Sequence, residues 1–108
     1  MSDSEVIDLR KAQLVRATNV VQSAARRDGV GYALWPEVQD LVTAGKVDRV
    51  EIADALERCV VVETGTRLGC PRYRVEVSDP DCSIETAVVS VHEDRLVIEV
   101  VTLKLKEK

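Results

Sequence analysis

The sequence has few of the residues that build large aromatic cores, covalent frameworks or membrane segments. It contains no Phe, one Trp and two Tyr, so its core must be built from Val, Leu, Ile and Ala. Three Cys at wide spacing indicate free thiols in a reducing cytosol and not a disulfide framework. The acidic start, Met1–Glu5, is not followed by an apolar run of signal-peptide or membrane-spanning length. We therefore expect a cytoplasmic protein that does not enter the membrane.

Positive charge is not in excess either. The net charge is -4 and the sequence pI is about 5.0, and acids outnumber bases in both halves of the chain. A general nucleic-acid binder is usually basic because it must neutralise an array of phosphates. The composition thus excludes a globally basic binding surface. A chain of 108 residues is long enough for one domain with a modest core.

The first part of the chain predicts one long helix over residues 3–27, within an N-terminal segment 1–28. Its apolar residues recur at heptad-like spacing: Ile7, Leu14, Ala17, Val21 and Ala24. Gly29 follows the basic last turn, as helix ends usually require. Such a stripe packs either on a sheet or on a second copy of itself, so a homodimer is one of the two expectations.

Two short helices are predicted next. Pro36, after Trp35, opens a helix over 36–44, and Asp48 with Glu51 forms a capping-box pattern for a helix over 49–58. The pair resembles a helix-turn-helix, but the acids of the second helix would repel phosphate, so we interpret it as a structural hairpin. The expected buried side chains are Val38, Leu41 and Val42 from the first helix, and Val50, Ile52 or Ala53, and Leu56 from the second.

The remaining residues alternate as strands do. They predict strands over 59–64, 72–77, 84–91 and 95–105, with a glycine-rich loop over 65–71. The alternation predicts that four side chains are buried together: Leu56, Val75, Val88 and Ile98. In the last strand the apolar phase changes between Val100 and Val101, which indicates either a bulge or a strand that is apolar on both faces.

These elements predict one α+β domain over residues 1–108. Three N-terminal helices precede a four-stranded, mainly antiparallel sheet, and residues 34–108 hold the helical hairpin with the sheet. The one local basic cluster, Arg67, Arg72 and Arg74, flanks the glycine-rich loop, whose backbone N–H groups could approach an anion. Together with Lys104 on the last strand these cations could hold a phosphate. The alternative is a solvated polar face of the sheet.

His92 is the single histidine and the side chain best suited to proton transfer near neutral pH. It lies at a turn, where a histidine is usually only solvated. A zinc site would need four ligands, and the available set is Cys59, Cys70, Cys82 and His92. Their spacings of ten to twelve residues contain no Cys-x-x-Cys pair, so we expect neither a metal nor a cofactor.

The order of several segments carries a family resemblance. The first short helix ends in Ala-Gly-Lys-Val, the second reads Val-Glu-Ile-Ala-Asp-Ala-Leu-Glu, and a valine-rich strand ending at Thr102 closes the sheet. Val60–Glu63 and Arg72–Val75 supply the strands between them, and Leu105–Lys108 is similar to the MqsR terminus. This order resembles the RelE-like toxin superfamily, in its MqsR-like and BrnT-like branches.

The resemblance implies a function as well as a fold. It implies a messenger-RNA endoribonuclease that works without a metal and is held in check by an antitoxin-like protein. Tyr73, Arg74 and Lys104 match sheet positions of the family pattern, and Arg74 and His92 are the catalytic candidates. The His-Ala…Arg motif of the early helices is missing, so we expect weak or absent cleavage. The alternative is a non-enzymatic protein-interaction module, dimeric through its N-terminal helix.

Overall fold

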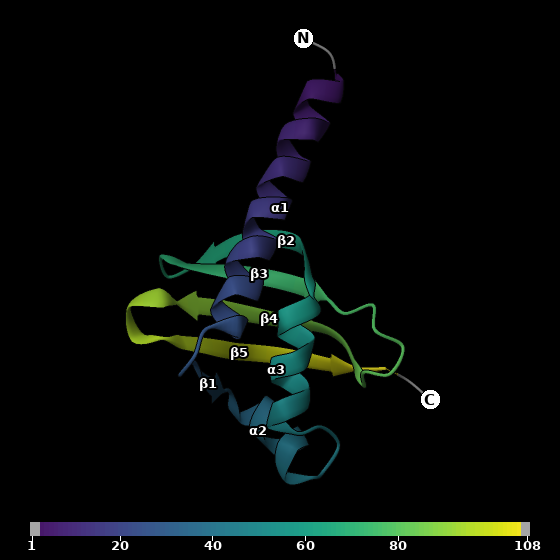
Figure 1. Cartoon of the computed structure of the whole chain (residues 1–108), viewed down its shortest axis with the longest axis vertical. Helices are drawn as coiled ribbons and strands as arrows, with labels where there is room; N and C mark the ends of the chain where they lie inside the picture. The colour runs from purple at the N-terminus through teal and green to yellow at the C-terminus, as the bar shows by residue number, and fades with distance from the viewer. Residues whose placement is uncertain (1–2, 107–108) are drawn as a thin grey trace.

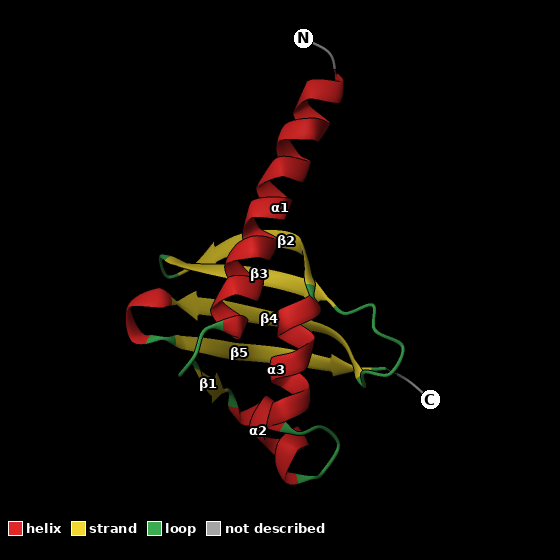
Figure 2. Ribbon diagram, viewed as in Figure 1, coloured by secondary structure: helices red, strands yellow, loops and turns green. Residues whose placement is uncertain are grey.

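A computed structural model describes residues 3–106 of the chain, with side chains described from residue 10 onward. It is an α+β structure with three α-helices and one five-stranded mixed sheet (Figures 1 and 2). The elements in chain order are α1 (Asp3–Arg26), β1 (Gly31–Leu34), α2 (Pro36–Thr43), α3 (Arg49–Arg58), β2 (Val60–Arg67), β3 (Cys70–Glu76), β4 (Ile84–His92), a single 3-10 turn (Glu93–Arg95) and β5 (Val97–Leu105). None of the described helices is long and apolar enough to cross a membrane.

The strand order in the sheet is β1-β5-β4-β3-β2. The four expected strands form an antiparallel meander from β2 to β5. The fifth strand, β1, was not predicted, and it pairs in parallel with β5 from Gly31 opposite Val97 to Leu34 opposite Val100. Because β1 is only four residues long and bonds to a segment far along the chain, no local pattern marks it.

The expected glycine-rich loop over 65–71 is wrong, because these residues are mostly strand. Gly65 pairs with Arg72 and Thr66 pairs with Pro71. The turn itself is only Leu68 and Gly69, both with positive φ, as the tight turn of a two-residue hairpin requires. Pro71 is tolerated because it precedes the part of β3 that pairs with β4.

The core lies between the sheet and the helices α1 and α3, which cross the same face of the sheet (Figure 1). The expected stripe of α1 is buried at Ala17, Val21 and Ala24 and half-buried at Leu14. The side chain of Ile7 lies outside the described residues. The N-terminal part of α1 continues past β2, the outer strand on that side (Figure 1). The opposite face of β2, β3 and β4 carries no helix in the part of the chain that the structure describes.

Two register shifts between β4 and β5 decide which side chains reach this core. The shift at Val88 and Val89 leaves Val101 as an extra residue, so a bulge, one of the two alternatives for this strand, is present. The other shift leaves Glu85 as an extra residue of β4, so Ile84 and Val89 are both buried. The prediction for Val88 is therefore wrong, since this side chain is half-buried on the other face.

The other three residues expected beside Val88 are buried in the core as predicted: Leu56, Val75 and Ile98.

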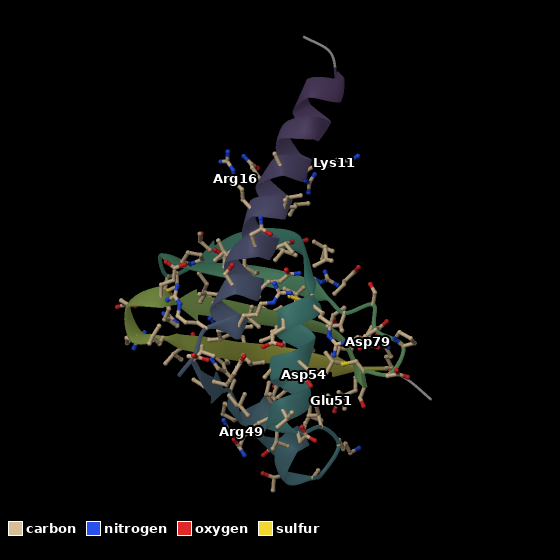
Figure 3. All side chains as sticks on the ribbon, in the orientation of Figure 1. Lys11, Arg16, Arg49, Glu51, Asp54 and Asp79 are labelled. Carbon is tan, nitrogen blue, oxygen red and sulfur yellow. The ribbon has the colours of Figure 1, made fainter. Side chains whose placement is uncertain are left out.

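The helix α3 serves as a structural support. The side chain of Asp48 accepts a hydrogen bond from the backbone N–H of Glu51 at 2.7 Å, which confirms the predicted cap. Ile52 and Leu56 are buried as expected, but Val50 is 70% exposed and does not join the core. The helix presents acids on its outer side, where Figure 3 labels Asp54 beside Glu51.

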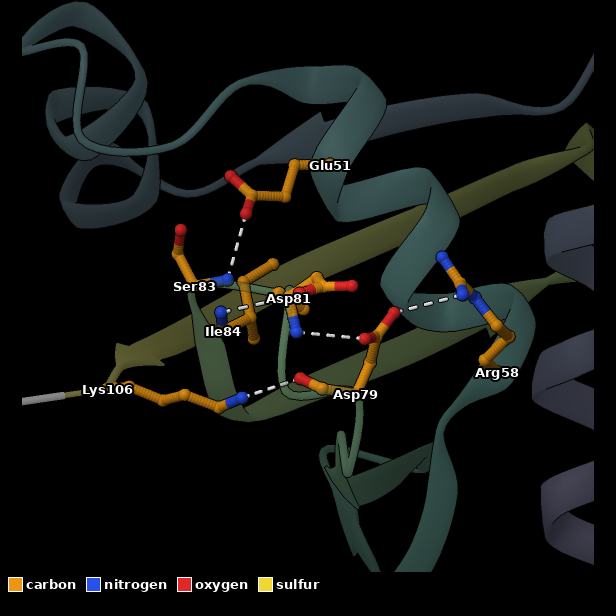
Figure 4. A network of polar contacts seen from close by, with 8 residues as sticks. Glu51, Arg58, Asp79, Asp81, Ser83, Ile84 and Lys106 are labelled. Carbon is orange, nitrogen blue, oxygen red and sulfur yellow. Dashed lines mark hydrogen bonds and ion pairs between the residues drawn. The ribbon is translucent and has the colours of Figure 1, made fainter.

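A set of polar contacts ties α3 to the connection between β3 and β4 (Figure 4). Arg58 pairs with the carboxylate of Asp79 at 2.9 Å, and Lys106 donates to the carbonyl of Asp79 at 2.6 Å. The backbone N–H of Ser83 donates to Glu51 at 2.9 Å. Glu51 and Asp79 are therefore already engaged in holding the connection between β3 and β4 against α3.

Candidate functional site

The helix-free face of the sheet contains a polar hollow of about 460 Å³. All four strands of the meander contribute to it. The side chains that matter most for its chemistry are Glu63, Arg72, Arg74, Thr86 and Thr102, and Gly65 also lines it. The hollow thus offers two guanidinium groups, one carboxylate and several hydroxyls within one concave surface.

The strand register explains why the two arginines meet there. Arg72 and Arg74 are two residues apart on β3, so their side chains leave the same face about 7 Å apart along the strand. Arg74 lies opposite both Glu63 and Val88, and Arg72 lies opposite Gly65. Neither arginine forms an ion pair with any described residue. Arg74 is exposed and open to an anion from outside, whereas Arg72 is half-buried and its charge also helps to lower the pKa of Glu99.

Arg72 is held in position by an aromatic ring. Its guanidinium carbon lies 5.1 Å from the centroid of the Trp35 ring, a cation–π geometry. The indole N–H of Trp35 donates to Glu99 at 2.5 Å. The Nε of Arg72 and the hydroxyl of buried Ser90 find no partner among the described atoms. Arg72 is thus oriented by its surroundings before any ligand arrives.

Glu99 connects this arrangement to His92. The second carboxylate oxygen of Glu99 lies 3.2 Å from Nε2 of His92, and Nδ1 of His92 lies 3.2 Å from a guanidinium nitrogen of Arg95. A proton on Nε2 satisfies both contacts, because Arg95 can then donate to Nδ1. The pKa of Glu99 is lowered, first by the hydrogen bond from Trp35 and then by that from His92. His92 therefore orients Glu99 and does not line the hollow.

The other predicted cations, Arg67 and Lys104, do not line the hollow. Arg67 stands at the tip of the β2–β3 hairpin, opposite Cys70. Lys104 lies opposite Thr86 in register and bonds to Glu85 at 3.5 Å, so its charge is already engaged. Tyr73 is half-buried against the core on the other face. Of the four predicted anion-binding residues, the structure brings together two, Arg72 and Arg74.

The cysteines are scattered. Cys59 and Cys82 are buried, whereas Cys70 is exposed. No group of three or more potential metal ligands occurs among the residues that the structure describes. Burial raises the pKa of the Cys59 thiol to about 11, so this group stays protonated near neutral pH.

Three residues of the candidate site were not predicted from the sequence: Trp35, Glu63 and Glu99. The spacing of Arg72 and Arg74 was visible in the sequence, but the other groups of the candidate site come from β2, β5 and the β1–α2 junction. Only the sheet register brings those segments together. Comparisons of the chain with protein-family models, curated proteins and solved structures return no match.

Proposed function

We propose that this chain is an RNA-binding domain of the RelE-like toxin type, in which Arg72 and Arg74 hold an RNA phosphate. The observation that carries the proposal is the pair of unpaired arginines in one concave hollow on the helix-free face. A guanidinium presents several N–H donors in a plane and can hold a phosphate through two of them. Thr86 and Thr102 add hydroxyl donors beside the arginines. The natural partners would be messenger RNA and an antitoxin-like protein.

Cleavage of that RNA is expected to be weak or absent. Cleavage without a metal needs a base near the 2′-hydroxyl and several cations aimed at the same oxygens. The catalytic candidate His92 has both ring nitrogens engaged away from the hollow. Glu63 adds a negative charge beside Arg74, which weakens the net attraction for phosphate. This geometry favours binding of RNA over its cleavage.

Binding of a fluorescent single-stranded RNA, followed by anisotropy at low salt, tests the proposal. Arg74→Ala should weaken binding about tenfold or more, because a hydrogen bond to a charged group contributes about 1.5–3 kcal/mol. Arg67→Ala removes the same charge outside the hollow and serves as the matched control. It should weaken binding less than about threefold, as a diffuse electrostatic effect does. Equal losses in the two variants would contradict a specific site.

Expression in a bacterial host separates binding from cleavage. We expect normal growth with both the wild type and Arg74→Ala, since cleavage is proposed to be weak or absent. Growth arrest that disappears in Arg74→Ala would show an active ribonuclease instead.

A second candidate, a homodimeric interaction module, is favoured by a different surface. Val15 of α1 is 58% exposed and Val60 of β2 is 50% exposed. They border an apolar groove of about 420 Å³ between the two elements, with Leu14 and Val62 among its walls. Because α1 continues past β2 here (Figure 1), a second copy of the chain could cover this groove. On the projecting part, Figure 3 shows Lys11 and Arg16 pointing to opposite sides.

The molecular mass in solution tests the dimer. If the groove is the interface, Val15→Asp together with Val60→Asp should convert a dimer into a monomer, because each charge would be buried unpaired. Val50→Asp on α3 is the control, since Val50 is even more exposed and lies outside the groove. A wild type that sediments as a monomer would exclude this candidate.

A further inference from the structure

We infer that the hollow selects guanine, with the carboxylate of Glu63 reading the base edge while Arg72 and Arg74 hold the neighbouring phosphate. The inference rests on the proposed RNA binding and names the base that the site prefers. The hollow contains both negative and positive side chains, namely Glu63 with Arg72 and Arg74. A ligand that fits must carry an anion and, at a short distance from it, a group of hydrogen-bond donors.

A bulge in β2 is what brings Glu63 to this face. The register runs from Val61 opposite Val75 directly to Glu63 opposite Arg74, so Val62 is an extra residue. Without the bulge, Glu63 would share the face of buried Val61 and point toward the helices. With it, the carboxylate is exposed in the hollow.

Glu63 is also unengaged. It lies directly opposite Arg74 in register, yet none of the ion pairs or side-chain hydrogen bonds of the described residues involves it. The polar network of this face runs instead from Arg72 through Trp35 to Glu99. A ligand can therefore use the acceptor of Glu63 and the donors of Arg74 at the same time.

Guanine is the base whose edge matches a carboxylate. Its Watson–Crick edge presents the N1–H and the exocyclic N2–H side by side, and the two oxygens of a carboxylate can accept both in parallel. Adenine and cytosine place an acceptor beside their donor, and uracil has one donor between two acceptors. In single-stranded RNA these edges are unpaired and open to a protein.

Gly65 leaves the space that a base requires. It lies two residues from Glu63 on the same strand and opposite Arg72. A Cβ added at Gly65 would meet nothing within 4 Å, and its φ is not in the positive range that favours glycine. The backbone conformation therefore does not require glycine here, and the absence of a side chain leaves open space in the part of the hollow beside Arg72.

Anisotropy with a series of single-stranded RNA hexamers tests the inference. Each is oligouridine with one central position changed to guanosine, inosine, adenosine or cytidine. We expect the guanosine oligomer to bind about tenfold more tightly than the uridine, adenosine and cytidine oligomers. Inosine should be intermediate, because it keeps the N1–H and lacks the N2 amino group. Equal affinities for all hexamers would overturn the inference and leave the proposed RNA binding intact, whereas absence of any binding would overturn both.

Glu63→Gln assigns the preference to this side chain. The amide keeps the size but replaces one acceptor with a donor, so the guanosine preference should disappear. Affinity for oligouridine should stay equal or rise, because a negative charge beside the phosphate is removed. Glu76→Gln is the matched control, since Glu76 is an exposed acid on neighbouring β3 that does not line the hollow. A guanosine preference that survives in Glu63→Gln would overturn the role of Glu63.

The variant Gly65→Val tests whether the base occupies the open space at Gly65. The branched side chain suits a strand and should leave the melting temperature unchanged or higher. It would occupy part of the hollow and should weaken binding of the guanosine hexamer about tenfold or more. Unchanged binding by a folded Gly65→Val variant would show that the base does not lie there.

Discussion

The two faces of the sheet are made by the same strands and differ in nearly every property. The face toward α1 and α3 buries Val61, Val75 and Ile98 almost completely. The other face presents Arg72 and Arg74 around an open polar hollow. Because alternate residues of a strand point to opposite sides, one run such as β3 serves both faces. The comparison shows that the buried core and the polar hollow are separated here by the parity of residues along a strand.

Bulges set that parity at the positions that matter most. Val62 is the extra residue of β2, and Val101 is the extra residue of β5. The first moves Glu63 to the open face. The second allows Val100 to stay in the core while Thr102 lines the hollow. Which side chains point to each face therefore depends on bulges in the strand pairing as well as on the alternation of residues along a strand.

The largest effect should come from a charge placed on the covered face. Val75→Asp would bury an unpaired carboxylate at a side chain with 0% exposure, and should cost at least about 3 kcal/mol of unfolding free energy. Val88→Asp is the matched variant on the open face, where the new carboxylate would lie opposite Arg74. It should cost less than about 1 kcal/mol. Urea denaturation followed by circular dichroism measures both unfolding free energies. Similar losses in the two variants would show that the two faces of the sheet do not differ in burial as described.

A smaller effect should come from the hydrogen-bond chain on the open face. Trp35→Phe keeps a ring under Arg72 but removes the N–H donor to Glu99, and should cost about 1 kcal/mol at neutral pH. The pKa of Glu99 is held below its ordinary value of 4.5 in the folded chain. Its stabilising contribution is present above that ordinary value and is lost as the pH falls through the folded pKa.

Unfolding free energies of the wild type and Trp35→Phe, measured between about pH 6 and about pH 3, test this pH dependence. The gap between them should narrow as the pH falls. A gap that is independent of pH would show that Glu99 is not the group concerned.

The smallest effect concerns the thiols, where no change in stability is expected. Exposed Cys70 should react with a thiol reagent near pH 8 well before Cys59, which is buried and whose pKa is raised to about 11. Mass spectrometry after partial alkylation identifies the modified residue. Cys70→Ser should remove the fast phase without changing the melting temperature. Early modification of Cys59 would show that the covered face opens readily.

Local features of the chain could be predicted because neighbouring residues decide them. The helix boundaries near Gly29 and Gly45, the cap at Asp48 and the four strands of the meander follow from short-range signals. The spacing of Arg72 and Arg74 on one strand face was also visible. Only part of the candidate site could therefore be proposed from the sequence, namely its cations.

The amino-acid sequence by itself determined the order of the helices and meander strands, the absence of an aromatic core, and the pair of arginines on β3. Only the tertiary structure decided that β1 joins β5, that Val88 leaves the core, and that Glu63 faces Arg74. Each of these depends on register between segments that are distant in the chain or separated by a bulge. A shift of one residue reverses the face of every following side chain, and that register is settled by packing of the whole sheet against its helices.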